Sequence, residues 1–486
     1  MRKPKPNLAC VRPGLGRAFS CALFLGACFL VSPARAQDLR PSQSALEALS
    51  PVTGVNREEG MAVADWMVYP SLFVGGVFND NIYAVATHRR VGAGLRLRPA
   101  LEANRDAGLH RSSIYFSADM QFYPGVNGRW RYAPTLTREH DPTSISARAG
   151  AIHVWTPMPD LKVTVSGDYT RQAGLFGSSF GAAAPLVYVT GGAPVGGAHR
   201  FSNQFTGHVS VEKEITDRLF VRGAATAQYI LYDRRPSDSF GGLPGVGFNG
   251  FNASSDAQSG VNVTGSLRAG YWITPQLYAF VEPAAEARRY RTALYDTNGY
   301  RILAGVGSDL ISLFRGEIHA GWQRQSSVRG AFAGAASPTV GARLFYYPTQ
   351  YLTLSATVDH TLTSAGAPVG NFGAAATGAL SPWLASAGGR TLQMRAQVDY
   401  AFSPDWSAFA RAGYGQTRWS QWGRRDVAWS AGAGMSYSFW RNVALTLEYQ
   451  VTRTASGNVW LASLWGAGAA AGYVQNIASV GLTYRY

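Results

Sequence analysis

Most of this 486-residue sequence divides into segments of about ten residues in which apolar and polar side chains alternate. Segment 391–402 is an example: Leu, Met, Ala, Val, Tyr and Phe alternate with Gln, Arg, Gln and Asp. Successive side chains of a β-strand point to opposite faces, so a period of two indicates strands. Aromatic residues gather at the ends of the apolar faces, as in the interfacial girdles of membrane barrels. The pattern predicts a transmembrane, antiparallel, up-and-down β-barrel with apolar side chains toward lipid.

Turn residues divide the sequence into about 18 such strands, with 16 as the alternative count. Short turns, such as Trp155–Pro157 and Phe402–Pro404, alternate with longer Gly-rich segments, such as 173–200 and 364–388. This alternation is typical of short periplasmic turns and long external loops. The predicted strands are 67–78, 91–104, 111–123, 143–155, 161–172, 201–214, 217–232, 258–273, 276–291, 299–311, 315–325, 338–347, 350–363, 390–402, 405–420, 427–440, 442–455 and 473–486.

The first 36 residues have the composition of a Sec-type signal peptide. Basic residues precede an apolar stretch at 18–31, and Ala34-Arg35-Ala36 then fits a cleavage site after Ala36. The alternative is a lipobox at Leu25–Cys28. All three cysteines lie within this segment, so the mature chain has neither thiol catalysis nor thiolate metal sites. We expect three parts: a signal peptide at 1–36, a periplasmic tail or plug segment at 37–66, and the barrel at 67–486.

The start of the predicted barrel carries a recognisable motif. Val68-Tyr69-Pro70-Ser71-Leu72-Phe73-Val74-Gly75 is followed by Phe78-Asn79-Asp80-Asn81-Ile82-Tyr83. This stretch resembles the opening strand and first loop of the outer-membrane β-barrel porin family that is often found with exopolysaccharide genes. The family has an Asp-Asp-Asn turn where this chain has Asn79 first. The resemblance implies an outer-membrane location in a Gram-negative bacterium. Asn79–Asn81 could alternatively form a calcium loop, although Asn and Asp clusters are ordinary turn residues.

Strand parity predicts which charged side chains line the lumen. The predicted inward basic residues are Arg96, Arg98, Arg148, Lys162, Arg222, Arg268, Arg288, Arg343, Arg395, Arg411 and Arg485. The predicted inward acidic residues are Glu102, Asp119, Asp168, Glu212, Glu282, Glu286, Glu317, Asp359, Asp399 and Glu448. This near balance fits an open, weakly selective pore, and it also fits a closed interior in which the charges pair with one another.

The expected partners are outer-membrane lipid and lipopolysaccharide, small hydrophilic solutes and the barrel-insertion machinery. Arginine forms bidentate bonds to phosphate, so arginine clusters near the external strand ends are candidates for lipopolysaccharide contact; solvated loop charge is the alternative. The candidates are Arg89, Arg90, Arg129, Arg131, Arg234, Arg235, Arg424 and Arg425. The last strand places Val480, Leu482, Tyr484 and Tyr486 on one face, which resembles the C-terminal insertion signal of outer-membrane barrels. We expect no nucleic-acid partner, and a homo-oligomer stays open.

No residue pattern supports catalysis. The eight histidines are scattered, and no metal-ligand spacing or phosphate-binding glycine loop occurs, so we expect no enzyme activity, metal or cofactor. The predicted function is a porin-like channel for passive passage of small hydrophilic solutes, in which loops such as 173–200 or 364–388 could narrow the lumen. The alternatives are a component of exopolysaccharide export or surface assembly, and a closed structural barrel or adhesin.

Overall fold

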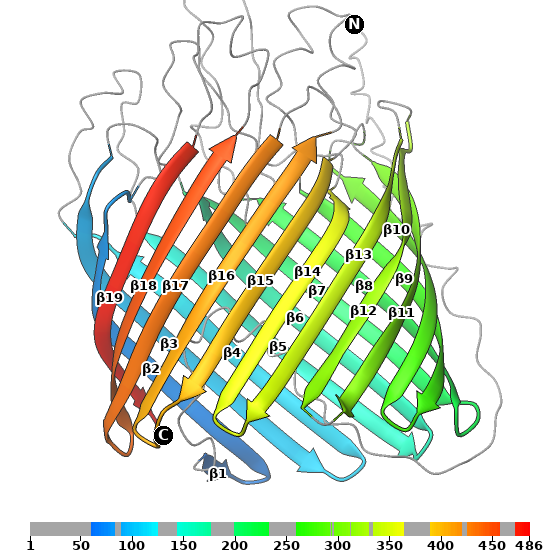
Figure 1. The fold of residues 1–486 in the computed structure, drawn as a ribbon, viewed down its shortest axis with the longest axis horizontal. Helices are drawn as coiled ribbons and strands as arrows, with labels where there is room; N and C mark the ends of the chain where they lie inside the picture. The colour runs from blue at the N-terminus through cyan, green and yellow to red at the C-terminus, as the bar shows by residue number, and fades with distance from the viewer. Residues whose placement is uncertain are drawn as a thin grey trace, which may run out of the picture.

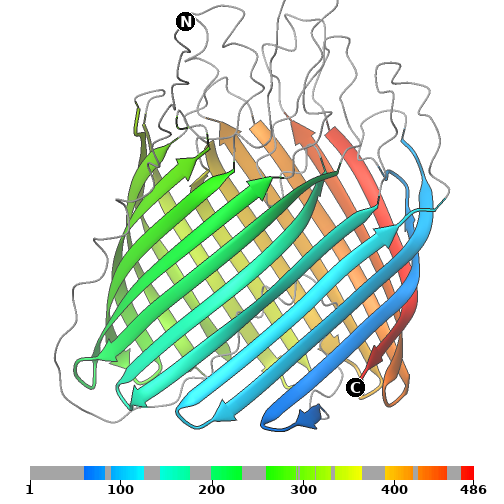
Figure 2. The ribbon, with the colours of Figure 1, turned by 180° about the vertical axis from the view of Figure 1, so that it is seen from behind.

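The protein forms one closed antiparallel β-barrel of 18 strands, with a further short strand at its N-terminal edge (Figures 1 and 2). The computed structural model describes residues 60–82, 89–124, 143–175, 199–232, 259–291, 293, 296–311, 313–329, 334–363, 389–419, 425–456 and 472–486. Among these residues, none belongs to a helix long and apolar enough to cross a bilayer. The 18 strands of the barrel confirm the strand count predicted from the sequence.

Each barrel strand contains 12 to 16 residues. The strands are β2 (Trp66–Asn79), β3 (Gly92–Ala107), β4 (His110–Phe122), β5 (Ser144–Met158), β6 (Leu161–Leu175), β7 (His199–Glu214), β8 (Leu219–Tyr232), β9 (Gly260–Thr274), β10 (Leu277–Tyr290), β11 (Thr297–Ile311), β12 (Phe314–Ser327), β13 (Ala335–Thr349), β14 (Leu352–Thr363), β15 (Gly389–Ala401), β16 (Trp406–Trp419), β17 (Arg425–Trp440), β18 (Val443–Ser456) and β19 (Gly472–Arg485).

The barrel closes where its last strand pairs with its first. In this seam β19 is antiparallel to β2, with Gly481 opposite Gly75, and every other strand pairs with its neighbours in sequence. The C-terminus lies at the rim formed by the short turns (Figure 1), and the longer connections join strands at the other rim. We call these the short-turn rim and the long-connection rim.

A short strand, β1 (Met61–Val63), precedes the barrel and was not predicted, because the segment 37–66 has few strand signals. It pairs with the start of β2, and Ala64 takes a positive φ of 51° in the turn between them. The predicted signal peptide and the other residues up to 59 lie outside the described residues.

Alternating side chains along each strand face opposite sides of the wall, as predicted. Large apolar side chains are exposed on one face, such as Ile302 (52% exposed), Leu482 and Tyr484. The opposite face holds buried residues such as Phe73 and Glu448. A belt of exposed apolar side chains is stable only in apolar surroundings. We call this the outward face and the other the inward face.

The Asn79–Asn81 turn fastens the seam between β2 and β19 at its end near the long-connection rim. Both carboxylate oxygens of Asp80 accept hydrogen bonds from Asn476, at 2.6 Å from its backbone nitrogen and 2.5 Å from its side-chain nitrogen. Asn81 is fully buried, donates to the Val474 carbonyl, and accepts from Gln475 at its own carbonyl. Of the two interpretations of Asn79–Asn81, an ordinary turn and a calcium loop, these hydrogen bonds are typical of the turn.

Replacing Asp80 with alanine should weaken this end of the seam. The substitution removes two charge-assisted hydrogen bonds, so we expect a loss of about 2 kcal/mol of unfolding free energy. The backbone amide of Asn476 should also exchange its hydrogen faster than in the wild type. Asp65→Ala is the control, because the exposed Asp65–Arg105 ion pair contributes at most about 1 kcal/mol. Equal amide exchange in the wild type and Asp80→Ala would contradict the fastening role.

Candidate functional site: ion-pair networks on the inward face

The largest cluster of inward charges surrounds the carboxylate of Glu448 on β18. Glu448 Oε2 lies 2.9 Å from Arg98 Nη1 and 3.3 Å from Arg96 Nη1, and its Oε1 lies 2.5 Å from Arg411 Nη2. Arg96 also forms a two-point contact with Asp119, at 2.6 and 3.0 Å. Only 4% of the Glu448 side chain is exposed. The cluster holds three guanidinium groups and two carboxylates.

The position of this cluster shows which face of the wall is concave. Glu448 and Arg98 lie on β18 and β3, and two strands, β19 and β2, separate them. Neighbouring strands are spaced ~4.8 Å apart, so three steps along the wall span ~14 Å. Side chains converge on the concave side of a curved sheet and diverge on the convex side. A direct contact across two strands therefore places Glu448 and Arg98 inside the barrel.

A second cluster lies on β9 to β12. Arg268 donates to Glu282 at 2.7 Å and reaches both oxygens of Glu317, at 2.7 and 3.2 Å. Arg301 lies 3.5 Å from the other oxygen of Glu282, and the Tyr278 hydroxyl donates to Glu317 at 3.1 Å. Each carboxylate thus contacts an arginine and one further donor.

A smaller cluster joins β4, β5 and β6. Asp168 accepts from Arg148 Nε at 2.7 Å, from the Tyr115 hydroxyl at 2.5 Å and from the Thr170 hydroxyl at 3.0 Å. Three donors on one carboxylate hold it firmly in place.

Aromatic rings support an arginine in each of these clusters. The guanidinium carbon of Arg268 lies 3.8 Å from the centroid of Phe280, and that of Arg98 lies 4.1 Å from the centroid of Phe73. The corresponding pairs on other strands are Arg148 over Tyr115 at 5.2 Å and Arg411 over Phe409 at 5.4 Å. Cation–π contact and carboxylate bonds together fix these guanidinium groups against the wall.

Several predicted lumen residues lie outside the three clusters. Glu102 accepts a hydrogen bond from Asn104, Asp399 accepts from Gln397, and Glu286 pairs with Arg288 on its own strand. Within the described residues Arg222, Arg343 and Arg395 form no ion pair, although Arg222 lies opposite Glu212 and Arg343 lies opposite Glu317 in register. These three arginines are the inward cations whose charge is least neutralised by a direct contact.

The predicted site residues did not include Arg301 or the inward aromatic residues Phe73, Phe280 and Phe409. Arg301 could have been found from its neighbours, because Tyr300 and Ile302 are apolar and lie on the outward face. The inward rings had no such signal, since an aromatic residue in a barrel strand fits either face.

Few of the lipopolysaccharide candidates lie within the described residues. Arg89 is exposed, the carbonyl of Arg90 accepts from the Ile82 amide, and Arg425 donates to Gln416 at 2.7 Å. Arg129, Arg131, Arg234, Arg235 and Arg424 are outside the described residues, as are nearly all of segment 173–200 and the whole of 364–388.

Two of the described histidines contact a hydroxyl group of a neighbouring strand. His208 lies 2.9 Å from the Thr226 hydroxyl, and His153 lies 2.9 Å from the Ser112 hydroxyl at an exposed turn-side position. The described residues contain no group of three His, Cys, Asp or Glu side chains that could hold a metal ion.

A comparison with family models gives a match over most of the chain. A family model with the description "Putative beta-barrel porin 2" matches residues 57–464. No curated protein matches the chain. Among solved structures, the FrpB iron transporter from Neisseria meningitidis is 7% identical, with a TM-score of 0.39 over 88% of this chain and 83% of its own. The copper transporter OprC is 10% identical, with a TM-score of 0.37 over 88% and 82% of the two chains. The siderophore receptor PirA from Pseudomonas aeruginosa is 9% identical, with a TM-score of 0.37 over 86% and 80%.

Proposed function

Because the chain belongs to the β-barrel porin 2 family, we propose that it is an outer-membrane channel for passive diffusion of small hydrophilic solutes. Barrels of 16 to 18 strands are wide enough to leave an aqueous channel, whereas interiors of about eight strands are filled by side chains. The Gram-negative outer membrane and the signal peptide cleaved after Ala36 are part of this proposal. So is insertion through the C-terminal strand ending at Tyr486.

The arrangement of the ion pairs is the observation that supports a pore rather than a closed interior. Each ion pair described above joins strands no more than three positions apart around the wall. The guanidinium groups also lie on aromatic rings of the same or an adjacent strand. Charges held in this way remain against the wall. A closed interior would instead need pairs that join opposite walls.

The charge balance supports weak ion selectivity. Adding Arg301 to the eleven predicted inward basic residues gives twelve, against ten acidic residues. Most of the inward arginines contact a carboxylate directly. The electric fields of the two opposite charges in each pair therefore largely cancel at the distance of a passing ion. Arg222, Arg343 and Arg395, which form no ion pair among the described residues, give the lumen a slight preference for anions.

Single-channel recording in a planar bilayer tests this function. We expect stable conductance steps and a small, anion-directed reversal potential, far below the ~59 mV that a tenfold gradient gives a perfectly selective pore. The double variant Arg222→Glu/Arg395→Glu should reverse the sign of this potential. Arg453→Glu is the matched control, because Arg453 lies on the outward face of β18, and its reversal potential should stay at the wild-type value. Absence of conductance from folded, inserted protein would reject the channel and favour a closed structural barrel.

A further inference from the structure

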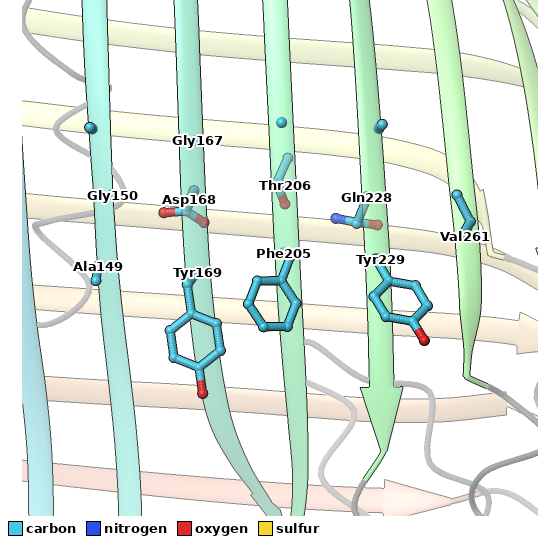
Figure 3. A pocket seen from close by; sticks show the side chains of 13 residues that line it. Ala149, Gly150, Gly167, Asp168, Tyr169, Phe205, Thr206, Gln228, Tyr229 and Val261 are labelled. Carbon is cyan, nitrogen blue, oxygen red and sulfur yellow. The ribbon is translucent and has the colours of Figure 1, made fainter. Parts of the chain in front are cut away.

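The outward surface of β5 to β9 contains a hollow of about 610 Å³ (Figure 3). Small residues on adjacent strands form its floor. Gly167 on β6 lies opposite Ala151 on β5 and Gly207 on β7, and Gly207 lies opposite Ala227 on β8. A Cβ atom added to Gly167 or to Gly207 would have no atom within 4 Å. The floor therefore faces open space on the outer side of the wall.

Three aromatic rings border the hollow on the side of the long-connection rim. Tyr169, Phe205 and Tyr229 lie opposite one another in register and side by side in Figure 3. The rings of Tyr169 and Phe205 are 4.9 Å apart, and Phe205 is 47% exposed. Such flat apolar sides suit a flexible hydrocarbon chain.

A cationic group lies directly beyond these rings. Arg171 is two residues from Tyr169 on the same outward face, one step closer to the long-connection rim, and its Nη1 donates to Asn203 at 2.8 Å. The Tyr169 hydroxyl donates to the same Asn203 oxygen at 2.9 Å. The network holds the guanidinium next to the hollow. A second arginine, Arg289, lies opposite Val261, a residue that lines the hollow.

From these features we propose that the hollow is a binding site for one acyl chain of a phosphorylated outer-leaflet lipid, with its phosphate at Arg171. The order from mid-wall to rim is apolar hollow, aromatic border and arginine, which matches the order of acyl chain, interface and phosphate in such a lipid. The lipid that we propose for this site is lipid A, the acylated and phosphorylated anchor of lipopolysaccharide. The site rests on the outer-membrane location in the proposed function and does not depend on channel activity.

The same surface is poorly suited to a second copy of the chain. In a two-fold contact, the same patch of both copies meets itself. The arginine beside the hollow would then approach its equivalent at the same depth in the membrane, which is unfavourable in a medium of low dielectric. An anionic lipid instead meets that charge with the opposite sign.

Native mass spectrometry of the purified full chain in detergent, titrated with lipid A, tests this site. Gly207→Leu adds a side chain to the floor of the hollow, where its Cβ has no atom within 4 Å, and Gly167→Leu does the same on the next strand. Either variant can serve if the other fails to fold. Gly223→Leu is the matched control, because Gly223 is on the same outward face, has nothing within 4 Å, and lies outside the hollow. Arg171→Gln tests the phosphate contact.

We expect the hollow-filling variants to bind one lipid A fewer than the wild type and Gly223→Leu. Arg171→Gln should bind that lipid about tenfold more weakly, since it loses one charge-assisted bond. Equal lipid A binding by the wild type and Gly207→Leu would overturn the proposal. So would equal affinity for phosphatidylethanolamine and lipid A, or a wild-type oligomer that Gly207→Leu converts to monomers. If the wild-type protein bound lipid A but showed no conductance, only the proposed channel function would be rejected, and the lipid site would stand.

Discussion

Replacing Glu448 with glutamine should destabilise the barrel by about 3 kcal/mol, because it removes one partner of a buried ion-pair cluster. Three arginines, Arg96, Arg98 and Arg411, donate to this one carboxylate. The Nη2 atom of Arg98 is already buried without a hydrogen-bond partner among the described residues. With the negative charge removed, Arg98 and Arg411 keep no carboxylate within ion-pair distance among those residues, and only Arg96 retains Asp119.

Urea unfolding of the refolded protein in lipid vesicles, followed by tryptophan fluorescence, measures this loss. Glu286→Gln is the matched control, since Glu286 pairs with Arg288 on its own strand and its side chain is 28% exposed. That variant should lose at most about 1 kcal/mol. If both variants unfolded at the same urea concentration, the cluster around Glu448 would not contribute to stability as proposed.

Glu448→Gln should also increase the preference of the channel for anions, because it leaves uncompensated positive charge on the inward face.

Replacing Gly270 with alanine should destabilise the barrel by about 1–3 kcal/mol, as overpacking of a filled core does. The ring of Phe220 on β8 lies directly against Gly270 on β9, so an added Cβ would be 2.1 Å from Phe220 Cζ. Phe220 is 6% exposed, and the rings of Trp272 and Tyr278 lie 5.7 and 5.6 Å from it. These neighbours leave Phe220 little room to rotate away.

The same strand supplies the control for this substitution. Gly265, five residues earlier on β9, faces outward, and a Cβ there would have no atom within 4 Å. Gly265→Ala should therefore change the unfolding free energy by less than about 0.5 kcal/mol. In a double-mutant cycle, Phe220→Leu should recover part of the loss in Gly270→Ala, because the two residues are in direct contact. Additive effects of the two substitutions would show that the ring does not constrain Gly270.

The sequence predicted much of the fold because the information is local. Period-two alternation depends only on neighbouring residues, so it indicated the strands and their number. The exposed outward positions of Val398 and Tyr400 follow from the same pattern, and the structure confirms them. Strand β1 was missed because a three-residue strand is too short to show a period.

The partners of the inward charges could not be predicted in the same way. Arg98 and Glu448 are 350 positions apart, and they meet only because β19 closes on β2. Parity predicts the face of a side chain, but the register of each strand pair and the curvature of the wall decide which charges touch. Near equality of basic and acidic residues therefore fitted both an open and a closed interior.

The amino-acid sequence alone thus determined a barrel of about 18 strands, the two faces of its wall and the approximate charge inside it. The tertiary structure decided how Asp80 fastens the closing seam, which arginines share Glu448, and where small residues from neighbouring strands align into the outward hollow. The physical reason is that alternation is a property of one strand. Ion-pair clusters and hollows are properties of several strands in a particular register, and closure of the barrel sets that register.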